Sequence, residues 1–211
     1  GGSGNAAAVL VGIDLLWELG LTQVDLQALG AKLGSDVPFC ISGGTAIATG
    51  RGELISPLPN LEGIYLVLGK YQSLEVSTPW AYGAYREAFG YEYALEPITL
   101  AERFHRVHSG ALVRAIVDRD PVKIGKLLYN DLEKVVLPAY PLVAQLRSEF
   151  QRHRNLGTMM SGSGPTVFCL VSSREQAEQI HHQVRAKIAN PDLELFVAKF
   201  CDRGVTVIAN S

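Results

Sequence analysis

The sequence lacks any long hydrophobic run. No stretch approaches the roughly 20 apolar residues that span a bilayer, and no positively charged leader precedes a shorter apolar segment. These absences predict a protein without a membrane partner, located in the cytoplasm or in an equivalent reducing compartment such as the plastid stroma. The chain begins with Gly1 rather than Met, inside a stretch with the composition of a ligand-binding loop, so we expect an upstream segment.

An excess of charge of one sign is also absent. The 211 residues include 19 Lys and Arg against 21 Asp and Glu, a formal net charge of −2 at pH 7. Nothing in this balance indicates a nucleic-acid partner or a disordered tail. Hydrophobic residues make up 47% of the chain, which predicts a globular protein with one large domain or two small ones. We expect a monomer or a weak homodimer.

Cysteine is scarce. Cys40, Cys169 and Cys201 lie far apart without Cys-x-x-Cys spacing, each in an apolar segment with strand character. This pattern favours buried free thiols over metal ligands. The cysteines are therefore not predicted to bind a metal.

The glycine-rich stretch Gly1–Ala8 runs into the strongest helical pattern of the chain. Apolar residues then recur at helical spacing, which predicts a buried helix from about Asn5 to Leu19 that ends at Gly20; they are Val9, Leu10, Ile13, Leu16, Trp17 and Leu19. Glycines let a ligand approach the backbone, and the free N–H groups at a helix start attract anions. The stretch predicts a phosphate-binding loop, the alternative being a flexible N-terminus before an ordinary helix.

The segment Leu33–Phe39 contains a candidate catalytic carboxylate. Ser35 or Asp36 could cap a short helix that has Pro38 in its first turn. Asp36 would then be held near the positive end of that helix. The alternative is that Asp36 is a plain N-cap.

Further local signals mark the rest of the first half. Thr22 with Asp25 resembles a capping box and predicts the start of a second helix that runs to Gly34. Two strands, Thr45–Thr49 and Glu53–Ile55, surround a tight turn and predict a β-hairpin. Prolines then break the pattern, so we place a domain junction near residues 57–62 and assign residues 1–60 and 61–211 to two domains.

The second domain is predicted to be an α+β unit. Its element order is typical of a split β-α-β arrangement, with helices packed on one face of a sheet. The first predicted helix of this domain begins at Ser77–Pro79, and further helices are predicted over residues 99–107, 111–118, 122–128, 135–153 and 174–188. The predicted strands cover residues 64–69, 166–171 and 193–200.

A second Gly/Ser-rich loop, Met160–Pro165, precedes an apolar strand. Neither loop is a Walker A motif, because no Gly-Lys-Ser/Thr follows the glycines, and the first lacks the Gly-x-Gly-x-x-Gly spacing of a Rossmann fingerprint. Two such loops, one from each predicted domain, could close on a single polyphosphate. The alternative for the second loop is a simple turn between a helix and a strand.

Four segments in register resemble the GHMP small-molecule kinases: Gly1–Ala7, Leu33–Phe39, Asn130–Glu133 and Met160–Phe168. Together with Ser77–Pro79, they are most similar to the members that phosphorylate 4-diphosphocytidyl-2-C-methyl-D-erythritol in the non-mevalonate isoprenoid pathway. The resemblance covers nearly the whole chain. It implies an α+β fold with two domains, the back part of a ribosomal-protein-S5-like N-terminal domain and a ferredoxin-like C-terminal domain.

The resemblance also implies an ATP-dependent phosphotransferase that uses Mg²⁺ and a cytidyl diphosphate alcohol. Asp36 matches the catalytic aspartate of the family, which orients the attacking hydroxyl or accepts its proton. The residues implied to bind ATP are Gly1, Gly2, Ser3, Gly4, Asn5 and Ala6 of the first loop and Ser161, Gly162, Ser163 and Gly164 of the second, and those implied to meet the substrate are Thr78 and Tyr82.

One position departs from the family pattern. Relatives usually carry a serine where this sequence has Gly4, so a hydroxyl that could reach phosphate or metal is missing. We therefore predict no metal ligand supplied by the protein. In the family, a preceding segment supplies a catalytic lysine, aromatic residues around the cytosine ring and the front of the glycine loop. The alternatives are a homoserine or mevalonate-type kinase, a diphosphomevalonate decarboxylase, and a non-catalytic binding module of the same fold.

Overall fold

The computed structural model describes residues 2–90, 102 and 107–208. Gly1 and most of the helix predicted over 99–107 lie outside the described residues. The chain divides into two compact units, Gly1–Leu61 together with Phe200–Ser211, and Glu62–Lys199. The boundary between Leu61 and Glu62 lies within the junction predicted over residues 57–62.

The C-terminal segment groups with the first unit, so its assignment to the second domain was wrong. The backbone N–H of Gly204 donates a hydrogen bond to the carbonyl of Ser42 (3.0 Å), and Val205 packs against the apolar core of the first unit. A Cβ built on Gly43 would collide with the backbone of Gly204. Local sequence patterns carry no signal for this contact, because it joins residues that are far apart along the chain.

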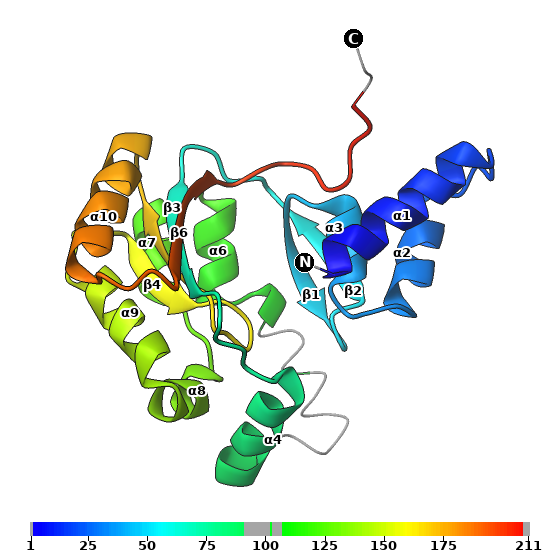
Figure 1. The fold of residues 1–211 in the computed structure, drawn as a ribbon. Helices are drawn as coiled ribbons and strands as arrows, with labels where there is room; N and C mark the ends of the chain where they lie inside the picture. The colour runs from blue at the N-terminus through cyan, green and yellow to red at the C-terminus, as the bar shows by residue number, and fades with distance from the viewer. Residues whose placement is uncertain (1, 91–101, 103–106, 209–211) are drawn as a thin grey trace. The chain divides into compact units, whose positions relative to one another are not determined.

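Three helices form most of the first unit: α1 (Gly2–Leu16), α2 (Gln23–Ala31) and α3 (Val37–Ser42) (Figure 1). The predicted start of α1 at Asn5 was wrong, because the glycines before it are already helical. The predicted capping box of α2 is confirmed. The Thr22 hydroxyl accepts from the Asp25 N–H, and the Asp25 carboxylate accepts from the Thr22 N–H.

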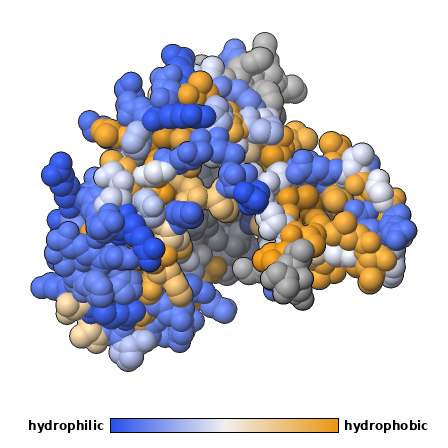
Figure 2. Space-filling model, turned by 90° about the horizontal axis from the view of Figure 1, so that it is seen from above, coloured by the Kyte–Doolittle hydropathy of each residue, from blue (hydrophilic) through white to orange (hydrophobic). Residues whose placement is uncertain are grey.

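Most apolar side chains of α1 and of the turn after it are exposed, so the prediction of a buried helix was wrong. Ala7 is the residue of α1 that is buried, and it packs with Leu26, Val37 and Ile41 into a small core. The helical spacing does produce an apolar stripe, but α2 and α3 cover only the part around Ala7. The exposed fractions are 58% for Val9, 77% for Leu16, 65% for Trp17 and 51% for Leu19. Hydrophobic surface accordingly gathers on this unit, at the right of Figure 2.

The predicted hairpin is confirmed, with β1 (Thr45–Thr49) antiparallel to β2 (Leu54–Leu58). Gly50 and Gly52 turn the chain with positive φ values of 70° and 107°, which glycine adopts without strain. Pro57 lies inside β2, opposite Ala46, instead of ending the strand. A two-stranded sheet has only edge strands, which tolerate a residue without an N–H.

A four-stranded antiparallel sheet organises the second unit. Its strands are β3 (Tyr65–Tyr71), β4 (Gly157–Met160), β5 (Val167–Val171) and β6 (Leu193–Lys199), in the spatial order β4-β5-β3-β6. The chain order β-α-β-β-α-β with this strand order is the ferredoxin-like topology, which confirms the fold implied for this unit. Sequence patterns missed β4 because its four residues begin with glycine and do not alternate between polar and apolar.

Helices connect these strands: α4 (Thr78–Phe89), α6 (Ala111–Val117), α7 (Pro121–Leu127), α8 (Glu133–Ala139), α9 (Pro141–Gln151) and α10 (Arg174–Lys187). The single helix predicted over 135–153 is two helices, because Tyr140 leaves the helical region (φ −125°, ψ 82°) before Pro141. Val67 of β3 shares one buried cluster with Leu146 of α9 and with residues of α10. This core fixes the sheet, and with it the loop between β4 and β5.

Candidate functional site

The first predicted phosphate-binding stretch forms the first turn of α1. Residues Gly2–Ala6 are helical, whereas Gly1 lies outside the described residues. The first N–H groups of a helix have no partner within the helix and carry the positive end of its dipole. A Cβ built on Gly2 or Gly4 would meet no atom within 4 Å. No described atom therefore covers Gly2 or Gly4 where a Cβ would lie.

Asp36 occupies the N-cap position of α3, but it does not act as a plain N-cap. Its backbone is in the right-handed helical region (φ −89°, ψ −10°) and its side chain makes no capping hydrogen bond. A capping side chain normally needs an extended backbone, which turns it back over the helix. The carboxylate is exposed and is thus available to a ligand. The adjacent Val37 packs with Ala7 of α1, so one core supports both Asp36 and the first turn of α1.

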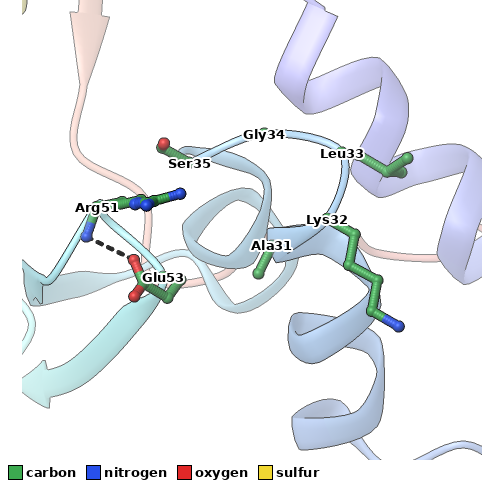
Figure 3. A pocket seen from close by; sticks show the side chains of 7 residues that line it. All are labelled: Ala31, Lys32, Leu33, Gly34, Ser35, Arg51 and Glu53. Atoms are coloured by element: carbon green, nitrogen blue, oxygen red, sulfur yellow. Dashed lines mark hydrogen bonds between the residues drawn. The ribbon is translucent and has the colours of Figure 1, made fainter.

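A pocket of about 400 Å³ lies beside the loop that leads to Asp36. It is lined by Ala31, Lys32, Leu33, Gly34, Ser35, Arg51 and Glu53. In Figure 3 the Arg51 side chain extends toward the loop that carries Ser35, whereas Lys32 and Leu33 point away from it. The backbone N–H of Arg51 donates a hydrogen bond to the Glu53 carboxylate (2.6 Å). The sequence pattern predicted a tight turn at this position and no role for Arg51 in the site.

The second Gly/Ser loop joins β4 to β5, so it is a turn between two strands rather than between a helix and a strand. Within it, the Ser161 N–H donates to the Thr166 carbonyl (2.8 Å) and the Gly164 N–H donates to the Ser161 carbonyl (2.9 Å). No hydrogen bond between described residues engages the N–H groups of Gly162 or Ser163. Consecutive free N–H groups in a turn form a concavity that binds anions.

α4 carries both predicted substrate residues. Its N-cap is Ser77, whose hydroxyl accepts from the Trp80 N–H. The hydroxyls of Thr78 and Ser163 are hydrogen-bonded at 2.8 Å, so the structure brings a substrate candidate against the second loop. Tyr82 is 54% exposed and presents a ring on which another aromatic group can stack.

The segment Asn130–Glu133 is one of those that resemble the family, but no role in the site was predicted for it. Asn130 donates to the carbonyls of Met160 and Gly162, and Glu133 accepts from the Met160 N–H. Polar residues before a helix were visible in the sequence, but their partners lie about 30 positions further along. The motif therefore contacts the backbone of the second loop, which only the fold reveals.

Asp131 anchors the same motif to α4. Its carboxylate accepts hydrogen bonds from the hydroxyls of Tyr85 (3.0 Å) and Tyr129 (3.0 Å) and pairs with the Lys134 ammonium (3.1 Å). Burial alone would raise the pKa of Asp131, but the bonds from Lys134, Tyr129 and Tyr85 outweigh it and hold the pKa below its usual value. The charged form is thus the one that the fold stabilises.

The three cysteines are free thiols in different surroundings. Cys169 is buried in β5, where burial raises its pKa to about 12. Cys40 is half-buried in α3 and Cys201 is exposed, so the prediction of buried thiols in strands was wrong for these two. In the described part of the chain, no group of three or more His, Cys, Asp or Glu residues could hold a metal ion. No described helix has both the length and the hydropathy to cross a bilayer.

The two groups of predicted site residues lie in different units. The first unit holds the first turn of α1 and Asp36, and the second holds Thr78, Tyr82 and the loop Ser161–Gly164. In the first unit, Val37 beside Asp36 packs in one core with Ala7 of α1, and in the second, Thr78 is hydrogen-bonded to Ser163. Their convergence on one ligand stays a prediction.

The sequence matches curated proteins along its whole length. The family described as GHMP kinases C terminal matches residues 112–190. A 4-diphosphocytidyl-2-C-methyl-D-erythritol kinase from Nostoc punctiforme is 61% identical over 211 residues, all of this chain and 67% of that protein. A protein of the same name from Trichodesmium erythraeum is 56% identical over 207 residues, 98% of this chain and 66% of that protein. The chain thus spans about two thirds of the length of these relatives.

Solved structures share the fold. A homoserine kinase from Cytophaga hutchinsonii superposes with a TM-score of 0.70 at 20% identity, covering 91% of this chain and 62% of that one. A crystal structure of 4-(cytidine 5'-diphospho)-2C-methyl-D-erythritol kinase superposes with a TM-score of 0.65 at 26% identity, covering 93% and 63% of the two chains. The first likeness concerns the fold alone.

Proposed function

The chain belongs to the GHMP kinases, within the family of 4-diphosphocytidyl-2-C-methyl-D-erythritol kinases, and on this premise we propose the reaction of the complete protein. It transfers the γ-phosphate of ATP to the 2-hydroxyl of 4-diphosphocytidyl-2-C-methyl-D-erythritol, a step of the non-mevalonate isoprenoid pathway. The observation that carries this proposal is the 61% identity to a kinase of that name across all 211 residues. The free carboxylate and the two glycine-rich turns support it.

In this proposal the first unit binds phosphate and activates the alcohol. The free N–H groups at the start of α1 bind the ATP phosphates, with Gly2–Ala6 forming the contact surface. Asp36 orients the attacking hydroxyl and accepts its proton. An alcohol is a poor nucleophile at neutral pH, so a carboxylate within hydrogen-bond reach supplies both positioning and base catalysis. Positioning and charge stabilisation dominate for the loose transition state of phosphoryl transfer.

The second unit holds the substrate and supplies further N–H groups for phosphate. Tyr82 presents an exposed ring on which the cytosine base stacks. The turn Ser161–Gly164 directs two free N–H groups toward phosphate oxygens. Through the bond between Thr78 and Ser163, the contact with the substrate and the contact with ATP are joined.

Mg²⁺ fits the residues present. This ion prefers oxygen ligands and is usually held by one or two carboxylates together with substrate phosphates. The ATP phosphates would supply most of these ligands, and Ser3 offers a hydroxyl in the first turn of α1. Asp36 is assigned to the alcohol and not to the ion. Bound with ATP, the ion neutralises phosphate charge. No ligand is assigned at Gly4, which has no side chain.

Two other activities share this fold. A homoserine or mevalonate-type kinase would place a different alcohol in the same site, and a non-catalytic module would bind ligands without turnover. The structural likeness to homoserine kinase has 20% identity, whereas the likeness to the cytidyl kinases has 61%. The identity therefore favours the cytidyl alcohol.

The test combines intact mass with substrate-dependent ADP release from Mg-ATP. The cytidyl diphosphate alcohol, homoserine and mevalonate are compared as acceptors. We expect a mass above the 22.8 kDa of this sequence and ADP release with the cytidyl alcohol only. Turnover with another alcohol would assign that alcohol as the substrate. ATP binding without turnover on any of the three would favour the non-catalytic module. Gel filtration and cell fractionation test the accompanying proposals of a monomer or weak homodimer and of a cytoplasmic or stromal location.

A further inference from the structure

The turn Ser161–Gly164 makes few bonds of its own. Two backbone hydrogen bonds close it, at Ser161 and at Gly164. A Cβ built on Gly162 would meet no atom within 4 Å, so side-chain packing does not fix the tip either. A turn with two glycines at positive φ also has more conformations available than one built from other residues. Another part of the fold must therefore hold its shape.

Asn130 supplies two of the missing bonds. Its side-chain nitrogen donates to the carbonyls of Met160 (2.8 Å) and Gly162 (2.8 Å), and its side-chain oxygen accepts from the Leu132 N–H (3.0 Å). An amide group has two donor hydrogens, and both are used on the loop backbone. Asn130 therefore fixes one peptide at the base of the turn and one at its tip.

Glu133 holds the other backbone group of Met160. Its Oε1 accepts from the Met160 N–H (2.7 Å) and from the Arg147 guanidinium (2.8 Å). The Glu133 side chain is 14% exposed and that of Arg147 24%, so this charge-assisted pair is largely shielded from water and stronger than a surface pair. Both the N–H and the carbonyl of Met160 are thus bound by the same short segment.

The segment that holds the turn is itself tied to α4. Asp131 accepts from the Tyr85 hydroxyl of α4 (3.0 Å). One end of that helix reaches the turn directly through Thr78 and Ser163 (2.8 Å). The helix, the segment 130–133 and the turn therefore form a closed set of hydrogen bonds, within which movement of one member strains the other two.

We propose that Asn130 and Glu133 are positioning residues of the kinase. They hold the Met160–Gly164 backbone so that the free N–H groups of Gly162 and Ser163 face the ATP phosphates. This inference rests on the proposed function, since it assigns the turn to phosphate binding. Neither side chain needs to touch ATP, because both act through the backbone that they bind.

Asn130→Asp in the complete protein is the most selective test. The variant keeps the oxygen that accepts from Leu132 but places a second oxygen against the two loop carbonyls. The matched control is Asn155→Asp, because Asn155 also donates from its side-chain nitrogen to two carbonyls, those of Phe150 (2.8 Å) and His153 (2.9 Å). The control thus has the same chemical change at a place that does not bind the turn.

We expect Asn130→Asp to speed amide hydrogen exchange in the turn and to lower kcat/KM for ATP by about 10- to 100-fold, the range that misplaced groups produce. Asn155→Asp should leave both within twofold. Glu133→Gln keeps the acceptor for Met160 and should retain most of the activity, whereas Glu133→Ala should lose as much as Asn130→Asp. Calorimetry of ATP binding by each variant adds a readout that does not depend on turnover.

The outcomes separate the two proposals. Unchanged exchange in Asn130→Asp, or faster exchange with unchanged ATP binding and kinetics, would overturn the inference. A wild-type protein that binds ATP without turnover would remove the proposed function, while weaker ATP binding by Asn130→Asp alone would still support the positioning role. A wild-type protein that binds no ATP would overturn both.

Discussion

Substitution of Asp36 by Asn separates catalysis from folding, because the carboxylate has no structural bond to lose. It makes no capping hydrogen bond and is exposed. A surface substitution of this kind changes the free energy of unfolding by less than about 0.5 kcal/mol. An N-cap that did cap its helix would lose about 1 kcal/mol. The structure therefore predicts a variant as stable as the wild type.

The effect on turnover should be much larger. Loss of a general base typically lowers kcat by about 10² to 10⁴, and 10² corresponds to about 2.7 kcal/mol of activation free energy. The expected effect on the reaction is thus at least about five times the effect on folding. ATP affinity should change little, because the phosphates are assigned to backbone N–H groups of α1 and of the second loop.

The assay pairs ADP release at saturating Mg-ATP and cytidyl alcohol with denaturant unfolding. Asp25→Asn is the control with the opposite profile, because Asp25 accepts from the N–H and the hydroxyl of Thr22 in the capping box of α2. We expect that control to be less stable and fully active. A folded Asp36→Asn protein with kcat within twofold of the wild type would refute the catalytic role.

Three further outcomes are expected. In a double-mutant cycle of Thr78→Val and Ser163→Ala, unfolding should give a coupling of about 1 kcal/mol, the size of one hydrogen bond, and additive effects would show that the bond is not maintained in solution. Because the folded-state pKa of Asp131 is lowered, its contribution to stability is present above the ordinary value of 3.8 and is lost as pH falls through the folded-state pKa. Asp131→Asn should therefore reduce the loss of unfolding free energy at acid pH, and an unchanged loss would contradict this. In steady-state kinetics, Tyr82→Ala should raise KM for the cytidyl alcohol by roughly tenfold, a size consistent with loss of one base-stacking contact, and should leave KM for ATP unchanged. A change in KM for ATP alone would show that the ring does not bind the cytosine base.

Features with a local cause were predictable from the sequence. The capping box of Thr22 and Asp25, the hairpin around Gly50 and the N-cap Ser77 all depend on residues within a few positions of one another. The same holds for the position of Asp36 before Pro38 in α3. Short-range geometry and propensity determine such features, so residue order alone predicts them.

Features that depend on distant partners were not predictable. The apolar positions of α1 have helical spacing, but whether Leu16 or Trp17 is buried depends on which elements cover them. β4 is a strand because it pairs with β5, not because its four residues favour one. The role of Asn130 became visible only when the fold placed Met160 beside it.

The return of residues 200–208 to the first unit affects the order in which the two units can complete their packing during synthesis. Everything that the second unit needs lies in one uninterrupted stretch, Glu62–Lys199. Most of the first unit is synthesised earlier, yet it receives the hydrogen bond of Gly204 to Ser42 and the apolar contact of Val205 from residues that follow the second unit. Domains usually finish folding in the order of synthesis. Here the unit that carries Asp36 gains these two contacts only after residues 62–199 have been synthesised.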